Sequence, residues 1–143
     1  MKISTKGRYG LRIMLVIALN GTDGSCVSIR DIAEREQLSD KYLEQIITSL
    51  SKAGLVSSIR GAKGGYRLTR QPDEITVEDI LIATEGTLAP MECAENSHSC
   101  DKYCDCVMTF VWQEMYDAVA KAARRITLQN IVDRSSNMQG KSC

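Results

Sequence analysis

Two short helices followed directly by a hairpin, between residues 28 and 68, limit the possible folds of this chain more than any other feature. Ser28 has an acidic residue three positions later and precedes apolar residues at helical spacing, which marks a helix N-terminus. Ser39 caps a second predicted helix that ends at Lys52. Such a pair predicts a helix-turn-helix, although Gln37 stands in the turn where many of these motifs have glycine. The inward-facing residues are expected to be Ile29, Ile32, Ala33, Leu43, Ile46, Ile47 and Leu50.

A β-hairpin is predicted immediately after the second helix. Residues 55–59 alternate between apolar and polar, residues 60–65 form a glycine-rich turn, and residues 66–68 return as a second strand. Arg60 and Lys63 lie near the tip, where the backbone can approach phosphates and an arginine can enter a minor groove. We call this basic hairpin the wing. The order of helix, turn, helix and wing predicts double-stranded DNA as a partner. The alternative is a plain helical hairpin with a tight turn after it.

Further helices are expected on either side of this motif. One begins at Ser4 or Thr5 and ends at Asn20, and another begins with a capping pattern at Thr76 and ends at Gly86. The first of these is expected to bury Leu11, Met14, Leu15, Ala18 and Leu19.

A long helix is predicted from about residue 105, followed by a short helix at about 127–133 and a disordered polar stretch at 135–141. Because the N-terminal domain is small, we expect the long helix to pack against its copy in a second subunit, giving a homodimer. Its broad apolar face consists of Val107, Met108, Val111, Trp112, Met115, Val119, Ala122 and Ile126.

The fold class predicted from these elements is mainly α with a small β-hairpin wing. Residues 1–86 form the winged helix-turn-helix DNA-binding domain, residues 87–104 a cysteine-rich loop, and residues 105–143 the dimerisation helix, the short helix and the tail. A chain of this length can bury a core without covalent cross-links.

The formal net charge is zero, but the two halves of the chain differ in sign. Residues 1–70 contain twelve Lys and Arg against six Asp and Glu, whereas residues 71–143 contain six against twelve. A basic half beside an acidic half is typical of a protein with one face toward a polyanion. The longest apolar run, residues 13–19, is too short to cross a bilayer, and there is no charged-then-apolar leader. We therefore expect a cytoplasmic protein with reduced thiols and no membrane partner.

Cysteines are concentrated in one short segment before the long helix. The four are Cys93, Cys100, Cys104 and Cys106. The only histidine, His98, lies among them. Thiolates bind soft metals and iron–sulfur clusters, so one loop could supply most of a ligand set. The segment therefore predicts a metal centre or a redox sensor, whereas Cys26 and Cys143 are expected to be incidental.

Residues 2–10 (KISTKGRYG), 42–45 (YLEQ), 53–56 (AGLV) and 60–66 (RGAKGGY) follow the pattern of a known family. With them the chain resembles the IscR/CymR/NsrR group of bacterial winged-helix repressors over nearly its whole length. The resemblance implies that the second helix contacts the major groove and that a wing arginine enters the minor groove. The base-contacting candidates carried over are Ser39, Lys41, Tyr42, Glu44 and Gln45, with Arg60 as the wing arginine. Glu can accept from cytosine and Gln can pair with adenine, whereas Tyr42 has packing as its alternative role.

In the IscR-like branch of this group, three loop cysteines hold a [2Fe–2S] cluster, and the last lies six residues before a tryptophan. Here Cys106 precedes Trp112 by six, so the resemblance implies Cys93, Cys100 and Cys106 as ligands. The fourth ligand of that branch is a histidine three residues after the last cysteine, where this chain has Thr109. Another branch borrows an acidic residue from the partner's first helix, but position 8 is Arg8. The nearest replacements are Cys104, which we prefer because thiolate is the usual ligand, and His98.

The resemblance thus implies a DNA-binding repressor whose affinity is controlled by a [2Fe–2S] cluster and which governs genes for iron–sulfur cluster biogenesis. A Zn²⁺ ion could instead use the same residues, as four cysteines or as three and His98. A thiol switch through Cys104 or Cys106 would need no metal, and a loop of spare thiols would match CymR-like members that sense through a partner protein. Control of cysteine and sulfur metabolism is the alternative function. An enzyme is not expected, because the chain has no oxyanion-forming glycine motif or phosphate loop.

Overall fold

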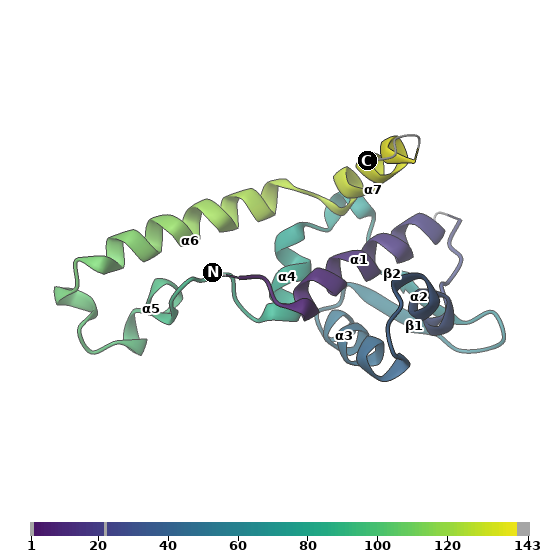
Figure 1. Cartoon of the computed structure of the whole chain (residues 1–143), viewed down its shortest axis with the longest axis horizontal. Coiled ribbons are helices and arrows are strands. Elements are labelled where there is room, and N and C mark those ends of the chain that lie inside the picture. Colours follow the sequence, from purple (N-terminus) through teal and green to yellow (C-terminus); the bar gives the residue numbers. More distant parts are fainter. Residues whose placement is uncertain (1, 22, 140–143) are drawn as a thin grey trace.

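The computed structural model describes residues 2–21 and 23–139 of the chain. The helices are α1 (Thr5–Asn20), α2 (Ile29–Glu36), α3 (Asp40–Lys52), α4 (Val77–Glu85), α5 (Glu92–Glu95), α6 (Met108–Arg125) and α7 (Leu128–Met138), and the strands are β1 (Val56–Ile59) and β2 (Gly65–Leu68). Helices α1 to α4 and the hairpin form a body, from which α6 extends to one side with α5 beside it, and α7 returns to α1 (Figure 1). This arrangement confirms the predicted mainly α fold with a small wing.

Helix α1 lies at the centre of the core and is buried over a wider arc than the sequence predicted. Its fully buried side chains include Ile13, Met14 and Ile17, with Val16 and Ala18 nearly so. Three of the residues predicted to face inward, Leu11, Leu15 and Leu19, are only half-buried. The wide buried arc arises because α2, α3, α4, α7 and β2 all contact α1, so the helix has no single inner face.

The predicted helix N-termini are confirmed by side-chain caps. The hydroxyls of Ser4, Ser28, Ser39 and Thr76 each accept a hydrogen bond from the backbone N–H three residues later. Between α2 and α3, Gln37 adopts φ 54° and ψ 45°, the left-handed conformation that favours glycine. Gln37 therefore occupies the expected glycine position at a local cost of about 1–2 kcal/mol.

The inner faces of α2 and α3 follow the sequence pattern closely. Leu43, Ile46, Ile47 and Leu50 are all at most 1% exposed. On α2, Ile32 and Ala33 are buried and Ile29 packs against the same core at partial exposure. The helix-turn-helix is thus fixed by a continuous apolar layer beneath α1.

The wing is a two-stranded antiparallel hairpin with Val56 of β1 opposite Leu68 of β2. Val27, before α2, pairs with Tyr66 through hydrogen bonds of 2.9 and 2.8 Å in the two directions, which extends the small sheet. Gly65 is required at this contact, because its φ is 152° and a Cβ would collide with the backbone of Val27. This glycine therefore fixes the base of the wing.

The C-terminal helices differ from the prediction in two places. Helix α6 begins at Met108, about three residues late, because Asp105 belongs to a preceding 3-10 turn and the N-cap residue Val107 supplies no capping side chain. Helix α7 continues to Met138, so the prediction of disorder was wrong for residues 135–138. Its first residue, Leu128, is completely buried in the core around α1, which holds the helix in place. Residues 140–143, with Cys143, lie outside the described residues.

Candidate DNA interface and cysteine loop

Helix α3 presents a polar face opposite its buried one. Lys41, Glu44 and Gln45 are exposed there, and no core contact restrains their side chains. Ser39, at the N-cap, accepts a hydrogen bond of 3.3 Å from the N–H of Tyr42, so its hydroxyl has a structural role of its own. The sequence pattern had placed these residues on one helix, and the structure brings them to one surface.

Tyr42 is half-buried and packs edge to face on Tyr9 of α1, with ring centroids 6.3 Å apart. The guanidinium of Arg12 lies 5.6 Å from the Tyr9 ring centre and pairs with Glu36 of α2, at 2.6 Å between Nε and Oε2. No local sequence pattern predicts this network, because its residues come from three helices and meet only after folding. It attaches the N-terminal part of α3 to α1.

The wing tip carries the two basic candidates, Arg60 and Lys63, and both are exposed. Neither forms an ion pair with any residue in the described ranges. Gly61, between them, has φ 118° with open space around it, so the tip turns through a glycine conformation. Two unneutralised cations on a thin hairpin can approach the phosphates of a duplex.

The cysteine loop, here taken as residues 93–106, consists of short helical turns without a longer helix or strand. Cys93 lies in the four-residue helix α5, Cys104 lies in the 3-10 turn before α6, and Cys106 follows that turn. Cys93 and Cys106 are half-buried, whereas Cys100 and Cys104 are exposed. All are free thiols. Among the described residues, no three Cys, His, Asp or Glu side chains lie close enough together to hold a metal ion. The predicted ligands thus share one loop but are not brought together, and the ligand set stays a prediction.

Cys104 and His98, the two candidates for the fourth ligand, are more accessible than Thr109, which stands at the position of the histidine in the IscR-like branch. Thr109 donates its hydroxyl to the carbonyl of Cys106 at 2.7 Å, and its backbone N–H donates to the same carbonyl at 3.2 Å. His98 is exposed, with Nδ1 3.4 Å from the hydroxyl of Ser97. Cys104 and His98 are therefore accessible donors, whereas the Thr109 hydroxyl is engaged with the backbone.

Helix α6 divides its apolar residues between two faces. Val119 and Ala123 pack with Leu81 of α4 and with Leu88, which follows α4 in the chain, and Ala120 is buried as well. A second stripe remains largely uncovered and consists of Met108, Val111, Met115, Ala118, Ala122 and Ile126. Met108 and Met115 are 44% and 39% exposed. Val107 and Phe110, near the helix start, are 81% and 69% exposed. The broad face predicted from sequence is thus two adjoining faces, of which one is occupied within the chain.

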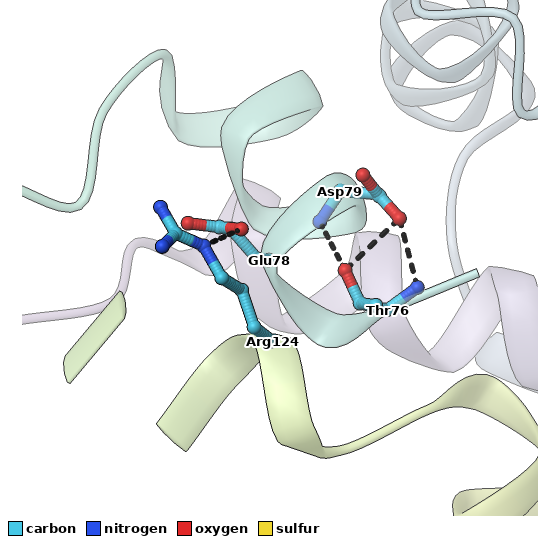
Figure 2. A network of polar contacts seen from close by, with 4 residues as sticks. All are labelled: Thr76, Glu78, Asp79 and Arg124. Carbon is cyan, nitrogen blue, oxygen red and sulfur yellow. Dashed lines mark hydrogen bonds and ion pairs between the residues drawn. The ribbon is translucent and has the colours of Figure 1, made fainter. Parts of the chain in front are cut away.

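A polar joint connects α6 to α4 (Figure 2). Arg124 donates from Nε to Glu78 at 2.7 Å, while Thr76 and Asp79 form the capping box that starts α4. The hydrogen bond and the charge of Glu78 raise the pKa of Arg124 above its ordinary value, so the guanidinium keeps its charge. The joint ties the C-terminal end of α6 to the helix that contacts α1.

Helix α4 carries this connection onward to α1. The carboxylate of Glu85, at the far end of α4, accepts hydrogen bonds from the N–H and the hydroxyl of Ser4, at 3.0 and 2.6 Å. A carboxylate is well placed at the N-terminus of α1, where the backbone N–H groups are free. The cysteine loop, α6, α4 and α1 therefore form a continuous series of contacts that ends at the helix-turn-helix.

Comparison with known proteins identifies the family. Residues 3–134 match the Rrf2 family, described as iron-dependent transcriptional regulators. The chain belongs to the Rrf2 family. It is 38% identical over 143 residues to protein rrf2 of Nitratidesulfovibrio vulgaris, covering 100% of this chain and 95% of that protein. The CymR regulator of Bacillus subtilis is 40% identical over 139 residues, covering 97% and 95%, and the IscR regulator of Aliivibrio salmonicida 36% over 132 residues, covering 92% and 77%.

Solved structures give the same result for the fold. The structure titled CymR (YrzC), the global cysteine regulator of B. subtilis, matches with a TM-score of 0.74 and 39% identity, over 94% of this chain and 98% of that one. The IscR structure from T. potens matches with a TM-score of 0.77 and 36% identity, over 100% and 94%. The protein is therefore a winged-helix transcriptional regulator and a DNA-binding protein rather than an enzyme. In the described ranges, no helix is both long and apolar enough to cross a membrane.

Proposed function

We propose that this Rrf2-family regulator is a dimeric repressor whose DNA affinity is controlled by a [2Fe–2S] cluster in the loop 93–106. The observation that carries the proposal is the position of four free thiols on a loop with little core of its own, directly before α6. The far end of α6 is joined to α4, and α4 to α1, so closure of the loop around a cluster would bias the elements that carry the helix-turn-helix.

The donor set fits such a cluster chemically. Cys93, Cys100 and Cys106 are the proposed ligands, and Cys104 is the preferred fourth because its thiol is exposed on the same loop. His98 is the alternative fourth ligand. When bound, the cluster would supply sensitivity to iron and to oxidants. The protein itself would supply the ligands on the loop and the contacts that hold α6 against α4.

At the DNA interface, we assign base contacts to the exposed face of α3. Glu44 and Gln45 are the proposed major-groove contacts, supported by their exposure and by hydrogen-bonding groups suited to cytosine and adenine. Lys41 and Lys63 are proposed to bind phosphates, and Arg60 to enter the minor groove. Ser39 and Tyr42 are the remaining candidates, and both also stabilise the start of α3.

The uncovered stripe of α6 is the proposed dimer interface, with a second copy of this chain as its occupant. An 18-residue helix is about 27 Å long, which is enough for two copies to cross and bury the methionines of both. The stripe continues through Ile126 into an apolar hollow of about 800 Å³ between α1 and α7, lined by Leu15, Ile131 and Met138. This continuity favours a large apolar interface rather than a small surface contact.

The similarity to CymR supports a second candidate function, the regulation of cysteine and sulfur metabolism. In that case the loop would hold Zn²⁺ or act as a thiol switch between Cys104 or Cys106 and another cysteine. The cysteines lie apart in the structure, so the loop would have to close before it could hold Zn²⁺ or bring two thiols together. This requirement is the same for both possibilities. Iron–sulfur cluster biogenesis genes remain the proposed targets if the cluster is present.

Purification without oxygen, followed by a visible absorption spectrum with iron and sulfide analysis, tests the cluster. We expect a coloured protein with two irons and two sulfides per chain, and Cys93→Ala, Cys100→Ala or Cys106→Ala should each abolish the colour. Cys104→Ala should damage the spectrum more than His98→Ala. Cys26→Ala, outside the loop, is the matched control and should leave it unchanged. A colourless protein with one tightly bound zinc per chain would contradict the cluster and favour the second candidate.

A further inference from the structure

A polar hollow of about 600 Å³ lies at the base of the wing, away from the cysteine loop. Its apolar floor comes from the end of α1, with Ile17 and Ala18, and from Leu68 of β2. Ser57 of β1 and Arg67 of β2, which are paired in the hairpin, form one wall. The remaining lining includes Arg70, Gln71 and, from α7, Gln129.

Both charged residues that line the hollow in the described part of the chain are basic. Arg67 and Arg70 are both exposed, and neither pairs with a carboxylate of the described residues. Within the described ranges, Arg70 donates one long hydrogen bond of 3.4 Å to the carbonyl of Glu74, and the residue also borders a second, smaller hollow that Asp79 lines. No Asp or Glu is among the described residues that line the hollow. Two arginines without an ion pair in the described ranges thus give the lining of the hollow an uncompensated positive charge.

The polar groups between the arginines are partly engaged elsewhere. The side-chain amide of Gln129 donates to Asp133 at 2.8 Å, which leaves its carbonyl free, and the hydroxyl of Thr69 donates to the carbonyl of Gly54. Donors facing the hollow therefore belong mainly to the two arginines. The planar fork of an arginine binds a carboxylate or a phosphate through two parallel hydrogen bonds.

We propose that this hollow binds a small anion that carries carboxylate or phosphate groups. Its volume suits a small metabolite, and an apolar floor beneath a few convergent polar groups is typical of ligand sites. None of the residues proposed to contact DNA lines the hollow, and no residue of α3 does. The ligand would contact α1, the wing base and α7 at once, so its occupancy adds a signal that is independent of the cysteine loop.

Titration of the full-length protein with inorganic phosphate and with succinate, followed by amide NMR, tests the site. We expect saturable shifts at Ser57, Arg67 and Gln129 with at least one probe at millimolar concentration. Arg67→Gln and Arg70→Gln should each weaken that binding by about tenfold or more, because each removes a charge-assisted pair. Lys121→Gln, which removes the same charge from exposed α6, should leave it unchanged.

Two results would overturn the proposal. The first is the absence of saturable binding of both probes, or shifts confined to the wing tip and the start of α3, where phosphate would only imitate DNA. The second is a loss of DNA affinity in Arg67→Gln without any added anion, together with a shallower salt dependence. That outcome would make Arg67 a contact to the DNA backbone. Unchanged DNA binding by this variant without anion, together with lost anion binding, supports the site.

Discussion

In the sequence, the wing region and the cysteine loop are alike, because each is a short, polar segment with several candidate binding residues. They differ in how the rest of the fold packs against them. The helix-turn-helix is stabilised by Leu43, Ile46 and Leu50, which are completely buried. Gly65 allows the base of the wing to pack closely against the backbone of Val27. The cysteine loop consists of single helical turns, and four of its fourteen residues carry exposed or half-buried thiols.

This difference separates a preformed surface from one that is completed by binding. Residues on α3 need no ligand to hold their positions, because packing fixes the helix from below. Most side chains of the loop are exposed or half-buried, and under the proposed function a ligand held by the thiols would order it. Under the proposed function, the same chain combines a preformed DNA-contacting helix with a loop that acts as the switch.

The largest effect is expected from disrupting the proposed dimer interface on α6. Substitution of Val111 and Met115 by Lys places two charges in the uncovered stripe and should give monomers that no longer retard DNA. The wild-type protein should bind a roughly palindromic site with half-sites about 34 Å apart. Sedimentation and gel retardation check both statements. A wild-type chain that sediments as a monomer at micromolar concentration would contradict the dimer.

Stability should divide sharply between the two regions when metal is absent. Leu43→Ala removes a fully buried side chain and should lower the free energy of unfolding by about 2–5 kcal/mol. Cys100→Ala, at an exposed position, should change it by less than about 0.5 kcal/mol. Urea denaturation curves of the metal-free variants, all recorded at the same protein concentration, measure both changes. Equal losses would show that the loop is as tightly packed as the helix-turn-helix.

Within the DNA interface, the helix and the wing should fail in different ways. Gln45→Ala should relax base preference at one position of each half-site, at a cost of about 1–3 kcal/mol. Arg60→Ala should weaken binding to all sequences and make the salt dependence shallower by about one phosphate equivalent. Binding curves at several salt concentrations distinguish the two. If neither variant alters binding to the best operator, α3 is not the DNA-contacting helix.

The smallest effect is expected at the joint between α6 and α4. Arg124→Gln removes the ion pair with Glu78 but leaves the apolar contact of Ala123 in place. Because Arg124 is exposed, stability should hardly change, whereas amide hydrogen exchange at Val77 should accelerate as the joint loosens. Lys121→Gln, elsewhere on α6, serves as the comparison. Unchanged exchange in Arg124→Gln would mean that apolar packing alone holds the two helices.

The sequence predicted elements wherever local signals agreed. The serine and threonine caps and the stripe on α3 were found because each depends on residues within a few positions of one another. The errors occurred where neighbours distant in sequence decide. Leu15 of α1 is only half-buried because it lines the open hollow beside α7, and α7 extends to Met138 because Leu128 anchors it in the core.

By itself, the sequence determined the identity of the chemical groups: a helix-turn-helix with a basic wing, Glu44 and Gln45 on its second helix, and a loop of thiols. Tertiary structure alone decided which of these groups meet. It joined Arg12 to Glu36 and Arg124 to Glu78, gathered two arginines around one hollow, and kept the thiols apart. Caps and helical stripes are local, and their energies are set within one or two turns, whereas contacts between elements exist only after the chain has closed around α1.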